Sequence, residues 1–584
     1  MSIRRGFACI DSGQLHYRYA GSGPPVILLH PSPQSSAFSI PMALRLAKNF
    51  MAIAVDTPGY GLSDPLPGNP LQPRLEDYVE PLRQFLDALG IDKAAIYGNA
   101  TGAEIAQLFA FAHPERVAVC MLDTAGHKED ADLDALLADY FPDVTPRRDG
   151  GHLLVHWDMV RSLSLFSPWQ KTTREHRLAV DLPSPDAIQG KLLDYLSAGA
   201  AYAAAYRPAF YTAKHPLISR VTVPATLTRW EGKPDLSEVD ALIARRLPKN
   251  FTVLRPGPSM NERLAASENY LLDHYLPSAR RAPSMPPQCR PARHVFQKMR
   301  IDVAGGQLQA RLKYHAGMLQ GSDFSWLALH DAGTSSRQMT ALLDAVATTR
   351  PGIAIDYPNC GDSDHCLPTD KLSIDALASC IALALKTLGI RRVAIIGQGV
   401  GGMVAMALAE KCPELVHSIT QLDVMCLEAA EKADWLAHYT PSLAPQWDGS
   451  HLTTAWAIVR DMALFSPWYR RTRAGVIPGN ANLDPTTLDI KVQDLLKAGD
   501  AWPTLIAEAL KYPFEEKLRA VRTPCILAAV AGTSQEVRSR RALVLATQCQ
   551  LALLAEDPDS WAATIASFAN RVPGAIPGSL PNSR

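Results

Sequence analysis

Two short stretches of the sequence have the spacing of a turn that presents a catalytic side chain. The run 98–102 reads Gly-Asn-Ala-Thr-Gly around Ala100, and the run 397–401 reads Gly-Gln-Gly-Val-Gly around Gly399. Small residues at both ends permit a strained strand-to-helix turn, a nucleophile elbow, whose middle side chain enters the active site. Neither alanine nor glycine carries an atom that can attack a substrate. The sequence therefore predicts two elbows without a nucleophile.

A further group of reactive side chains stands at the start of a predicted helix. His152 is followed by Trp157 and Arg161, which are four positions apart and therefore share one helix face. An imidazole, an aromatic ring and a guanidinium together suit an aromatic or carboxylate-bearing ligand. A seam that packs this helix against its neighbours is the alternative, because the apolar run 165–169 follows directly. We treat His152 as a candidate acid–base residue and Trp157 and Arg161 as candidate ligand contacts.

Alternating strands and helices must position these side chains. The helical segments that we expect early in the chain cover 75–89, with a kink at Pro81, and 103–112. Short apolar runs, typical of strands buried on both faces of a parallel sheet, occupy 26–29, 52–55, 94–97, 117–122, 225–228 and 251–254. Repeated strand–helix–strand units predict an α/β protein with a doubly wound sheet.

Almost the whole chain is a tandem duplication. The run Leu165–Trp169 recurs letter for letter as Leu464–Trp468, and Leu122-Asp123 recurs as Leu422-Asp423. The spacing between such matches stays at 299 or 300 positions. This regularity predicts two copies of one fold.

The repeat and the composition of its flanks divide the chain. A Pro/Arg-rich stretch between the copies suits a linker, and the end of the chain is rich in Pro, Gly and Ser. The expected parts are a first domain over 1–276 with a helical cap over about 127–215, a linker over 277–293, a second domain over 294–572 with a cap over about 427–515, and a flexible tail over 573–584.

These motifs resemble the α/β-hydrolase fold, in the capped branch that includes carbon–carbon bond hydrolases, epoxide hydrolases and haloalkane dehalogenases. The resemblance rests on the run 30–33, His-Pro-Ser-Pro, on the run from Asp56 to Asp64, and on the elbow glycines. It implies two α/β-hydrolase-like domains, each a doubly wound, mostly parallel sheet with a helical cap inserted after the sixth strand. It does not specify a reaction, because this fold hosts many.

The family's catalytic triad is incomplete in both copies. The resemblance places the acid of the first copy at Asp235, after the penultimate strand, and the nucleophile at Ala100. The base should follow the strand at 251–254, but the run 255–261 contains no histidine. In the second copy no histidine follows His451. A serine mechanism needs all three groups, so we expect chemistry without a triad.

Polar residues at strand ends and beside the elbow then remain as candidates. His30 and Asp123 are candidate acid–base residues, although His30 can instead brace its loop and Asp123 can instead cap the next turn. Ser32, Ser35 and Thr101 are candidate ligand contacts. The first copy keeps more such groups than the second, so we expect the active pocket in the first copy.

Composition excludes several classes of partner. Lys+Arg and Asp+Glu both number 58, so no net charge attracts nucleic acid or an anionic membrane. No run reaches the roughly 20 apolar residues of a membrane helix. The ten cysteines lack CxxC spacing, which favours reduced thiols and a cytoplasmic location over a zinc site. We expect no metal and no cofactor.

The sequence thus favours a cofactor-independent enzyme that acts on a small hydrophobic carbonyl or carboxylate compound. Lyase, isomerase, cyclase and atypical hydrolase reactions all fit acid–base or electrostatic catalysis in a lidded site. A non-catalytic ligand-binding or scaffold protein is the alternative, and a conventional serine hydrolase is disfavoured. We expect the two copies to pair within the chain, while pairing with a second chain stays open.

A fluorophosphonate probe tests the absence of a serine nucleophile. Because no hydroxyl stands at either elbow, we expect the purified protein to stay unlabelled when its intact mass is measured after incubation. A mass increase mapped to any serine would contradict this.

Overall fold

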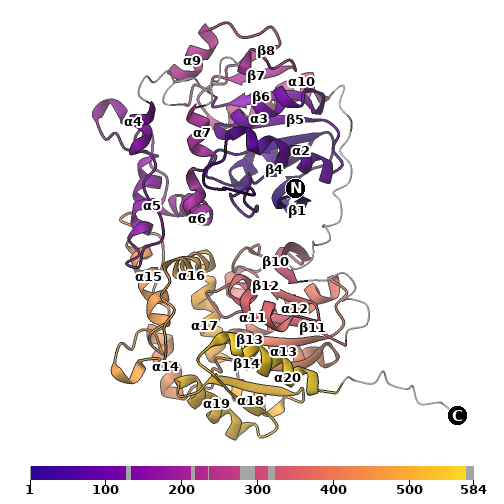
Figure 1. Cartoon of the computed structure of the whole chain (residues 1–584), viewed down its shortest axis with the longest axis vertical. Coiled ribbons are helices and arrows are strands. Elements are labelled where there is room, and N and C mark those ends of the chain that lie inside the picture. Colours follow the sequence, from indigo (N-terminus) through magenta and orange to yellow (C-terminus); the bar gives the residue numbers. More distant parts are fainter. Residues whose placement is uncertain are drawn as a thin grey trace, which may run out of the picture. The chain divides into compact units, whose positions relative to one another are not determined.

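The computed structural model describes residues 2–125, 133–211, 217–233, 236–276, 280, 296–313 and 323–573. The chain divides into two compact units (Figure 1). The first comprises Met1–Cys289 with the short segment Pro445–Gly449, and the second comprises Arg290–Ala444 with Ser450–Arg584.

The first unit is built on an eight-stranded sheet within the described residues. Its strands are β1 (Arg4–Ile10), β2 (Gly13–Ala20), β3 (Pro25–Leu29), β4 (Met51–Val55), β5 (Ala94–Asn99), β6 (Val117–Asp123), β7 (Ala225–Thr228) and β8 (Phe251–Leu254). They lie in the order β1-β2-β4-β3-β5-β6-β7-β8. Only the β1–β2 and β2–β4 pairings are antiparallel among these strands. All six apolar runs expected to be strands lie in this sheet.

Helices connect these strands and form the cap. The connecting helices are α1 (Ile40–Leu46), α2 (Val79–Ala88), α3 (Thr101–Ala112) and α9 (Ser237–Ala244), and α10 (Met260–His274) follows the last strand. Between β6 and β7 stand the cap helices α4 (Leu133–Ala138), α5 (Gly151–Ser162), α6 (Pro185–Ala198) and α7 (Tyr206–Tyr211). A helical insertion therefore follows the sixth strand, as the sequence predicted.

The expected helix over 75–89 has a different form. Residues Leu75–Tyr78 make a 3₁₀ turn, and the α-helix begins at Val79. Pro81 therefore lies in the first turn, where its missing N–H is not needed for a helical hydrogen bond. No kink is required at that position.

The second unit repeats this architecture in its described residues. Its strands are β9 (Gln297–Val303), β10 (Gly306–Lys313), β11 (Ser325–Leu329), β12 (Gly352–Ile355), β13 (Val393–Gln398), β14 (Val416–Leu422), β15 (Cys525–Val530) and β16 (Gln550–Leu554). They lie in the order β16-β15-β14-β13-β11-β12-β10-β9, which is the strand order of the first sheet written from the opposite edge. The two sheets show that the fold class was predicted correctly.

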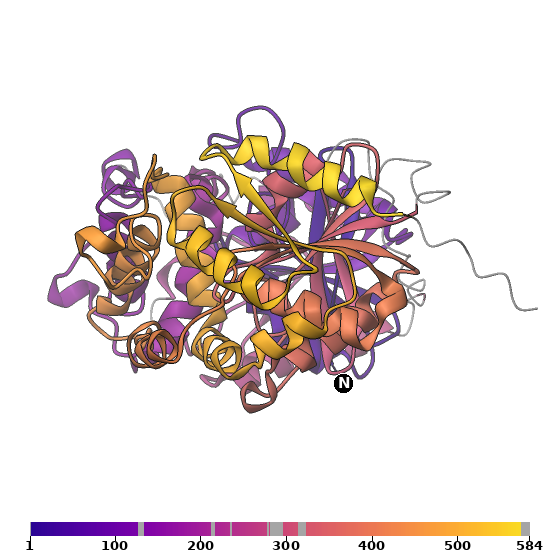
Figure 2. The same cartoon turned by 90° about the horizontal axis from the view of Figure 1, so that it is seen from below.

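Helices cover both faces of the second sheet, and Figure 2 shows α20 in yellow on one face with further helices on the other. The connecting helices are α11 (Thr340–Val346), α12 (Ile374–Thr387), α13 (Val400–Lys411) and α19 (Ser534–Leu545), and α20 (Trp561–Arg571) follows the last strand. Between β14 and β15 stand α14 (Ala429–His438), α15 (Ser450–Met462), α16 (Pro485–Ala498), α17 (Ala501–Lys511) and α18 (Phe514–Ala520).

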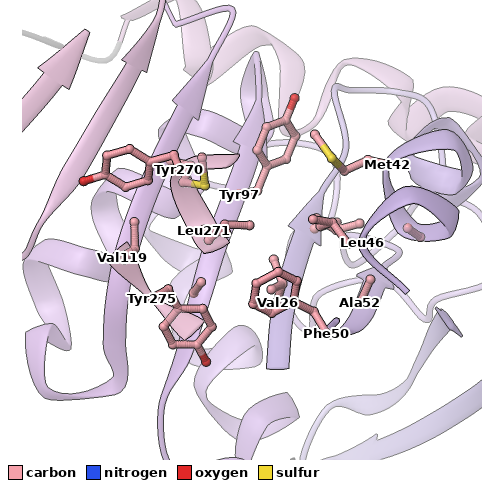
Figure 3. Packing of buried hydrophobic residues seen from close by; sticks show 14 of the residues in the cluster. Val26, Met42, Leu46, Phe50, Ala52, Tyr97, Val119, Tyr270, Leu271 and Tyr275 are labelled. Carbon is pink, nitrogen blue, oxygen red and sulfur yellow. The ribbon is translucent and has the colours of Figure 1, made fainter. Parts of the chain in front are cut away.

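A buried apolar cluster fastens the last helix of the first unit to its sheet. Leu271 of α10 and Tyr275, which directly follows this helix, pack with Phe50 and with Val26 of β3 (Figure 3). The rings of Phe50 and Tyr275 are stacked, with centroids 6.0 Å apart. Burial of such aromatic and aliphatic side chains stabilises each unit by about 1.5–3 kcal/mol per side chain.

The recurring Asp-x-Pro-x-x-Gly motif has a structural cause. The buried Asp56 carboxylate accepts hydrogen bonds from the backbone N–H groups of Ser36 (2.6 Å) and Leu62 (2.9 Å) and contacts His16 Nδ1 at 2.8 Å. Burial opposes ionisation, but His16 and the positive charge of Arg18 hold the pKa of Asp56 well below its usual value. A Cβ on Gly61 would lie 2.1 Å from this carboxylate, so only glycine fits there.

No helix among the described residues is long and apolar enough to cross a membrane.

Cys9 is disulfide-bonded, so the expectation of reduced thiols throughout the chain was wrong for this residue. The other eight cysteines in the described part of the chain are free thiols.

The Asp56 contacts predict a large effect of Asp56→Asn on stability. Removing one partner of a buried ion pair costs about 3–5 kcal/mol, so we expect the urea midpoint of the variant to fall clearly. The depressed pKa means that wild type loses this stabilisation as pH falls below about 4, and the variant should lose less over that range.

Asp77→Asn is the matched control, because Asp77 forms an exposed pair with Arg74 at 3.2 Å. Such pairs contribute about 0–1 kcal/mol. Equal midpoints for the Asp56 and Asp77 variants would contradict the role of Asp56.

Candidate active site

Both units form the strand-to-helix turn of a nucleophile elbow. Ala100, between β5 and α3, has φ 48° and ψ −117°, and Gly399, between β13 and α13, has φ 52° and ψ −115°. A residue with a Cβ rarely adopts such a conformation, at a cost of about 1–3 kcal/mol. The surrounding packing therefore imposes the elbow even where alanine occupies it.

The glycines around the elbow are required by close packing. A Cβ on Gly98 would lie 2.1 Å from the carbonyl oxygen of Gly102, and a Cβ on Gly102 would lie 2.4 Å from that of Leu29. Strand β5, helix α3 and the end of β3 therefore approach more closely than any side chain allows. This explains the Gly-x-x-x-Gly spacing physically.

In the second unit a carboxylate fills the space beside the elbow. Asp331, in the loop after β11, places Oδ1 only 2.3 Å from the position that a Cβ on Gly399 would take. The same Oδ1 accepts hydrogen bonds from the backbone N–H groups of Val400 (2.9 Å) and Ala332 (2.8 Å). In acyl transfer, two N–H groups at these places form the oxyanion hole. Asp331 thus fills the space that a nucleophile's side chain would take, and it accepts the two N–H groups that would bind an oxyanion.

The environment of Asp331 brings the pKa of its carboxyl group close to neutral pH. Burial raises the pKa of Asp331 to about 6, the negative charge of Asp423 acts in the same direction, and the N–H groups of Val400 and Ala332 oppose the shift. No described group donates a hydrogen bond to Oδ2. This oxygen is therefore available to take or give a proton near neutral pH.

Asp331 lines a cavity of about 240 Å³ between the sheet and the cap of the second unit. Gln398, Gly399 and Asp423 contribute polar atoms at the strand ends. Aromatic residues form much of the wall, namely Trp435, Tyr439, Phe465, Trp468 and Trp502. Apolar walls with a few polar groups are typical of small-molecule sites.

Helix α16 is fastened to the loop that carries Asp331. The carboxylate of Asp494 accepts hydrogen bonds from Ser335 Oγ and Gln338 Nε2, each at 2.8 Å. Burial raises the pKa of Asp494. A Cβ on Gly333 would lie 2.6 Å from Trp502 and 3.0 Å from Leu495, so the loop packs directly on the cap. The cap is thereby held over the carboxylate.

Larger side chains occupy the corresponding places of the first unit. Tyr195 stands where the second unit has Leu495, and His156 where it has Ala455. The buried Tyr60 donates to the carbonyl oxygen of Tyr202 at 3.1 Å and accepts from the N–H of Ala205 at 2.9 Å. Pro31 replaces Asp331 in the loop after β3. The sequence favoured the first copy for the active pocket, whereas the elbow-facing cavity described above lies in the second.

Two of the predicted acid–base residues make structural contacts. His30 is buried, with Nδ1 3.0 Å from the carbonyl oxygen of Pro31, while its Nε2 accepts from the N–H of Thr57 at 2.9 Å. Burial lowers the pKa of His30. Asp123 accepts from Tyr97 Oη and from Arg263 Nε, the latter at 2.8 Å. His30 thus braces its loop, and Asp123 anchors helix α10 through Arg263.

Asp123 and Asp423 match in the sequence repeat but do not occupy equivalent positions in the two sheets. Asp123 pairs with Asn99 in the sheet, whereas Gln398, the counterpart of Asn99, pairs with Leu422. Thr124 and Asp423 share a positive φ of 54°, so these two residues are the structural equivalents. The repeat shifts by one residue at this strand, which places the second aspartate at the cavity.

The predicted cap residues of the first unit contact neighbouring backbone. His152 Nδ1 accepts from the N–H of Arg147 at 3.1 Å. Trp157 Nε1 and Arg161 Nη1 donate to the carbonyl oxygen of Trp447, at 3.0 and 3.3 Å. Trp447 belongs to the segment 445–449 of the same compact unit.

The other predicted contacts are distributed around the first elbow. Thr101 begins α3 and is buried, and Ser32 is buried beside Tyr60. The N–H of Ser35 donates to Asp194 Oδ2 at 3.2 Å. Asp235 lies outside the described residues. Among the described residues, no group of three or more His, Cys, Asp or Glu side chains could hold a metal ion.

A profile described as the alpha/beta hydrolase fold matches residues 24–184 and 329–459, half of the chain. The chain belongs to the α/β-hydrolase fold family.

Curated proteins within the family match part of this chain. A 2-hydroxy-6-oxononadienedioate/2-hydroxy-6-oxononatrienedioate hydrolase of Dechloromonas aromatica is 36% identical over 118 residues, 19% of this chain and 40% of that protein. Haloalkane dehalogenase 2 of Mycobacterium tuberculosis is 30% identical over 105 residues, 18% of this chain and 36% of that protein. The matches therefore span well under half the length of these relatives.

Solved structures also resemble this α/β-hydrolase chain. Epoxide hydrolase A of Mycobacterium thermoresistibile is 16% identical and covers 48% of this chain and 99% of its own, with a TM-score of 0.38. The structure of E-2-(acetamidomethylene)succinate hydrolase is 23% identical and covers 46% of this chain and 99% of its own, with a TM-score of 0.35.

Sequence reasoning missed Asp331. The signal was present, because the loop reads His30-Pro31 in the first copy and His330-Asp331 in the second. In an α/β-hydrolase the residue after this histidine borders the oxyanion hole, so a carboxylate there changes the site's charge.

The contact between Asp331 and the second elbow predicts that Gly399→Ala is destabilising. The added Cβ would clash with Asp331, and the alanine would have to adopt a positive φ. We therefore expect the free energy of unfolding to fall by about 1–3 kcal/mol or more, measured by thermal unfolding. The double variant Gly399→Ala/Asp331→Gly should recover part of this loss.

Ala100→Gly at the first elbow is the matched control and should change stability by about 1 kcal/mol at most. Unaltered unfolding of Gly399→Ala would contradict the position assigned to Asp331.

Proposed function

We propose that the chain is a cofactor-independent enzyme that performs acid–base chemistry on a small apolar carbonyl compound in the cavity of the second unit. One observation carries the proposal: the Asp331 carboxylate, with a pKa raised to about 6, lies inside this cavity at the elbow. A buried carboxylate titrating near neutral pH is suited to accept a proton from carbon or oxygen.

The reaction class follows from what the cavity contains. Neither elbow offers a nucleophile, so an ester intermediate on serine is not formed. The ionised Oδ2 of Asp331 takes a proton from the carbon next to the substrate carbonyl, and the same group returns it to the product. Aromatic walls, including Trp435 and Trp502, exclude water and hold a ring or a branched chain. Lyase and isomerase reactions both begin in this way.

A non-catalytic ligand-binding protein is the second candidate. It is favoured by the occupation of the two N–H donors of Val400 and Ala332 by Asp331, which leaves them unable to stabilise a substrate oxyanion. A binding protein needs only the cavity and its aromatic walls. The two candidates differ in turnover and not in affinity.

Proton exchange on a simple ketone separates these candidates. Phenylacetone is incubated with the protein in D₂O, and loss of its α-proton signals is followed by NMR. We expect wild type to accelerate the exchange and Asp331→Asn to lower the rate constant by about 10²- to 10⁴-fold. The variant keeps the size and shape of the side chain, so binding of phenylacetone should persist.

Asp77→Asn, which changes an exposed carboxylate of the first unit, is the control and should leave the exchange rate unchanged. Exchange that is equal in wild type and Asp331→Asn would contradict the assignment of Asp331. Binding of phenylacetone without exchange would favour the ligand-binding candidate.

The exchange should also depend on pH in a defined direction. Asp331 acts as a base only when ionised, so the rate constant should rise with pH and level off above about 6, the raised pKa of this group. A profile that levels off near pH 4, or that falls as pH rises from 5 to 7, would contradict the role of Asp331 as base.

A further inference from the structure

A lysine of the cap stands in the same cavity as Asp331. Lys491 lies on α16, one helical turn before Leu495, and both residues line the cavity. No described residue forms an ion pair or a hydrogen bond with its Nζ. Lys497 of the same helix, in contrast, donates to Asp362 Oδ1 at 2.8 Å. Lys491 is therefore an amine without a counter-ion in a largely apolar space.

This environment favours the neutral amine. Burial lowers the pKa of Lys491, and no neighbouring carboxylate offsets the effect. A lowered pKa means that a larger share of the side chain is unprotonated at neutral pH than in free lysine. An unprotonated amine is a nucleophile towards carbonyl carbon, which a protonated one is not.

The fold holds this lysine close to the loop of the candidate base. Asp494, three residues further along α16, is bonded to Ser335 and Gln338, and Leu495 packs on Gly333. The helix cannot move away from the loop without breaking these contacts. Lys491 and Asp331 therefore line the same cavity from opposite structural layers, cap and sheet.

We propose that Lys491 is a covalent catalytic residue that forms an imine with an aldehyde or ketone substrate. The Nζ lone pair attacks the carbonyl carbon, a C–N bond forms as the C=O π bond opens, and the carbonyl oxygen takes the proton that Nζ loses to give a neutral carbinolamine. A second proton, taken from solvent, converts the hydroxyl group into water, and as this water leaves the nitrogen lone pair forms the C=N bond of the protonated imine. The imine withdraws electrons from the neighbouring carbon, from which Asp331 removes a proton. This deepens the proposed function and rests on the same cavity.

The first unit supplies a natural comparison. Lys191 occupies the equivalent place on α6. Lys191, however, is an exposed residue, and Tyr195 stands beside it where the second unit has Leu495. Proline occupies the position of Asp331 in that unit. The imine is therefore assigned to Lys491 and not to Lys191.

Reductive trapping tests the proposal. The full-length protein is incubated with phenylacetone and sodium cyanoborohydride at pH 7, and its intact mass and tryptic peptides are measured. We expect one reduced ketone adduct per chain, mapped to Lys491. Lys491→Arg should lose this adduct by at least about tenfold, because a guanidinium stays protonated and does not attack a carbonyl carbon, and Lys191→Arg should form it as wild type does.

The outcomes separate this proposal from the proposed function. An adduct on Lys491 that also forms in Asp331→Asn, with proton exchange lost in that variant, supports both. Exchange that depends on Asp331 but persists at the wild-type rate in Lys491→Arg overturns the imine and leaves the proposed function intact. Adducts spread equally over surface lysines, or retained in Lys491→Arg, also overturn it. An adduct without any exchange in wild type keeps the amine site and overturns the acid–base function.

Discussion

One carboxylate held between two backbone amides determines what the second unit can do. Oδ1 of Asp331 accepts the N–H groups of Val400 and Ala332 and fills the space beside Gly399. An acyl-enzyme mechanism needs both that space and those donors. The same contacts, together with burial, give the cavity a group that titrates near neutral pH. The carboxylate that fills the space beside the second elbow is therefore the same group that we propose as the acid–base residue.

The rest of each unit maintains the geometry around this position. Ala100 keeps the positive φ of an elbow although it has no reactive atom. Gly98 and Gly102 pack so closely on their neighbours that the backbone between them is held in this conformation. Asp56 and Asp356 organise their own loops by accepting backbone N–H groups. These constraints serve folding, so they persist whether or not a triad is present. They explain why an α/β-hydrolase fold alone does not define a reaction.

The sequence was sufficient for the fold and insufficient for the site. Apolar runs and elbow glycines predicted the strands and turns correctly, because buried strands and close backbone packing restrict residue type at every such position. The site depended on small differences between the copies, such as Pro31 against Asp331 and Tyr195 against Leu495. Whether such a difference opens or fills a cavity depends on packing between distant segments, which one sequence does not reveal. The one-residue shift at Asp423 likewise appeared only in the strand register.

The titration of Asp331 itself tests the central claim most directly. Protein with ¹³C-labelled aspartate carboxyl groups is titrated by NMR, and the Asp331 signal is assigned by its disappearance in Asp331→Asn. The account predicts a transition near pH 6 for that signal, accompanied at the same pH by a shift of the Val400 amide resonance, because one hydrogen bond joins the two groups. A transition near pH 4, as in a solvated aspartate, with a Val400 amide that does not respond, would contradict it.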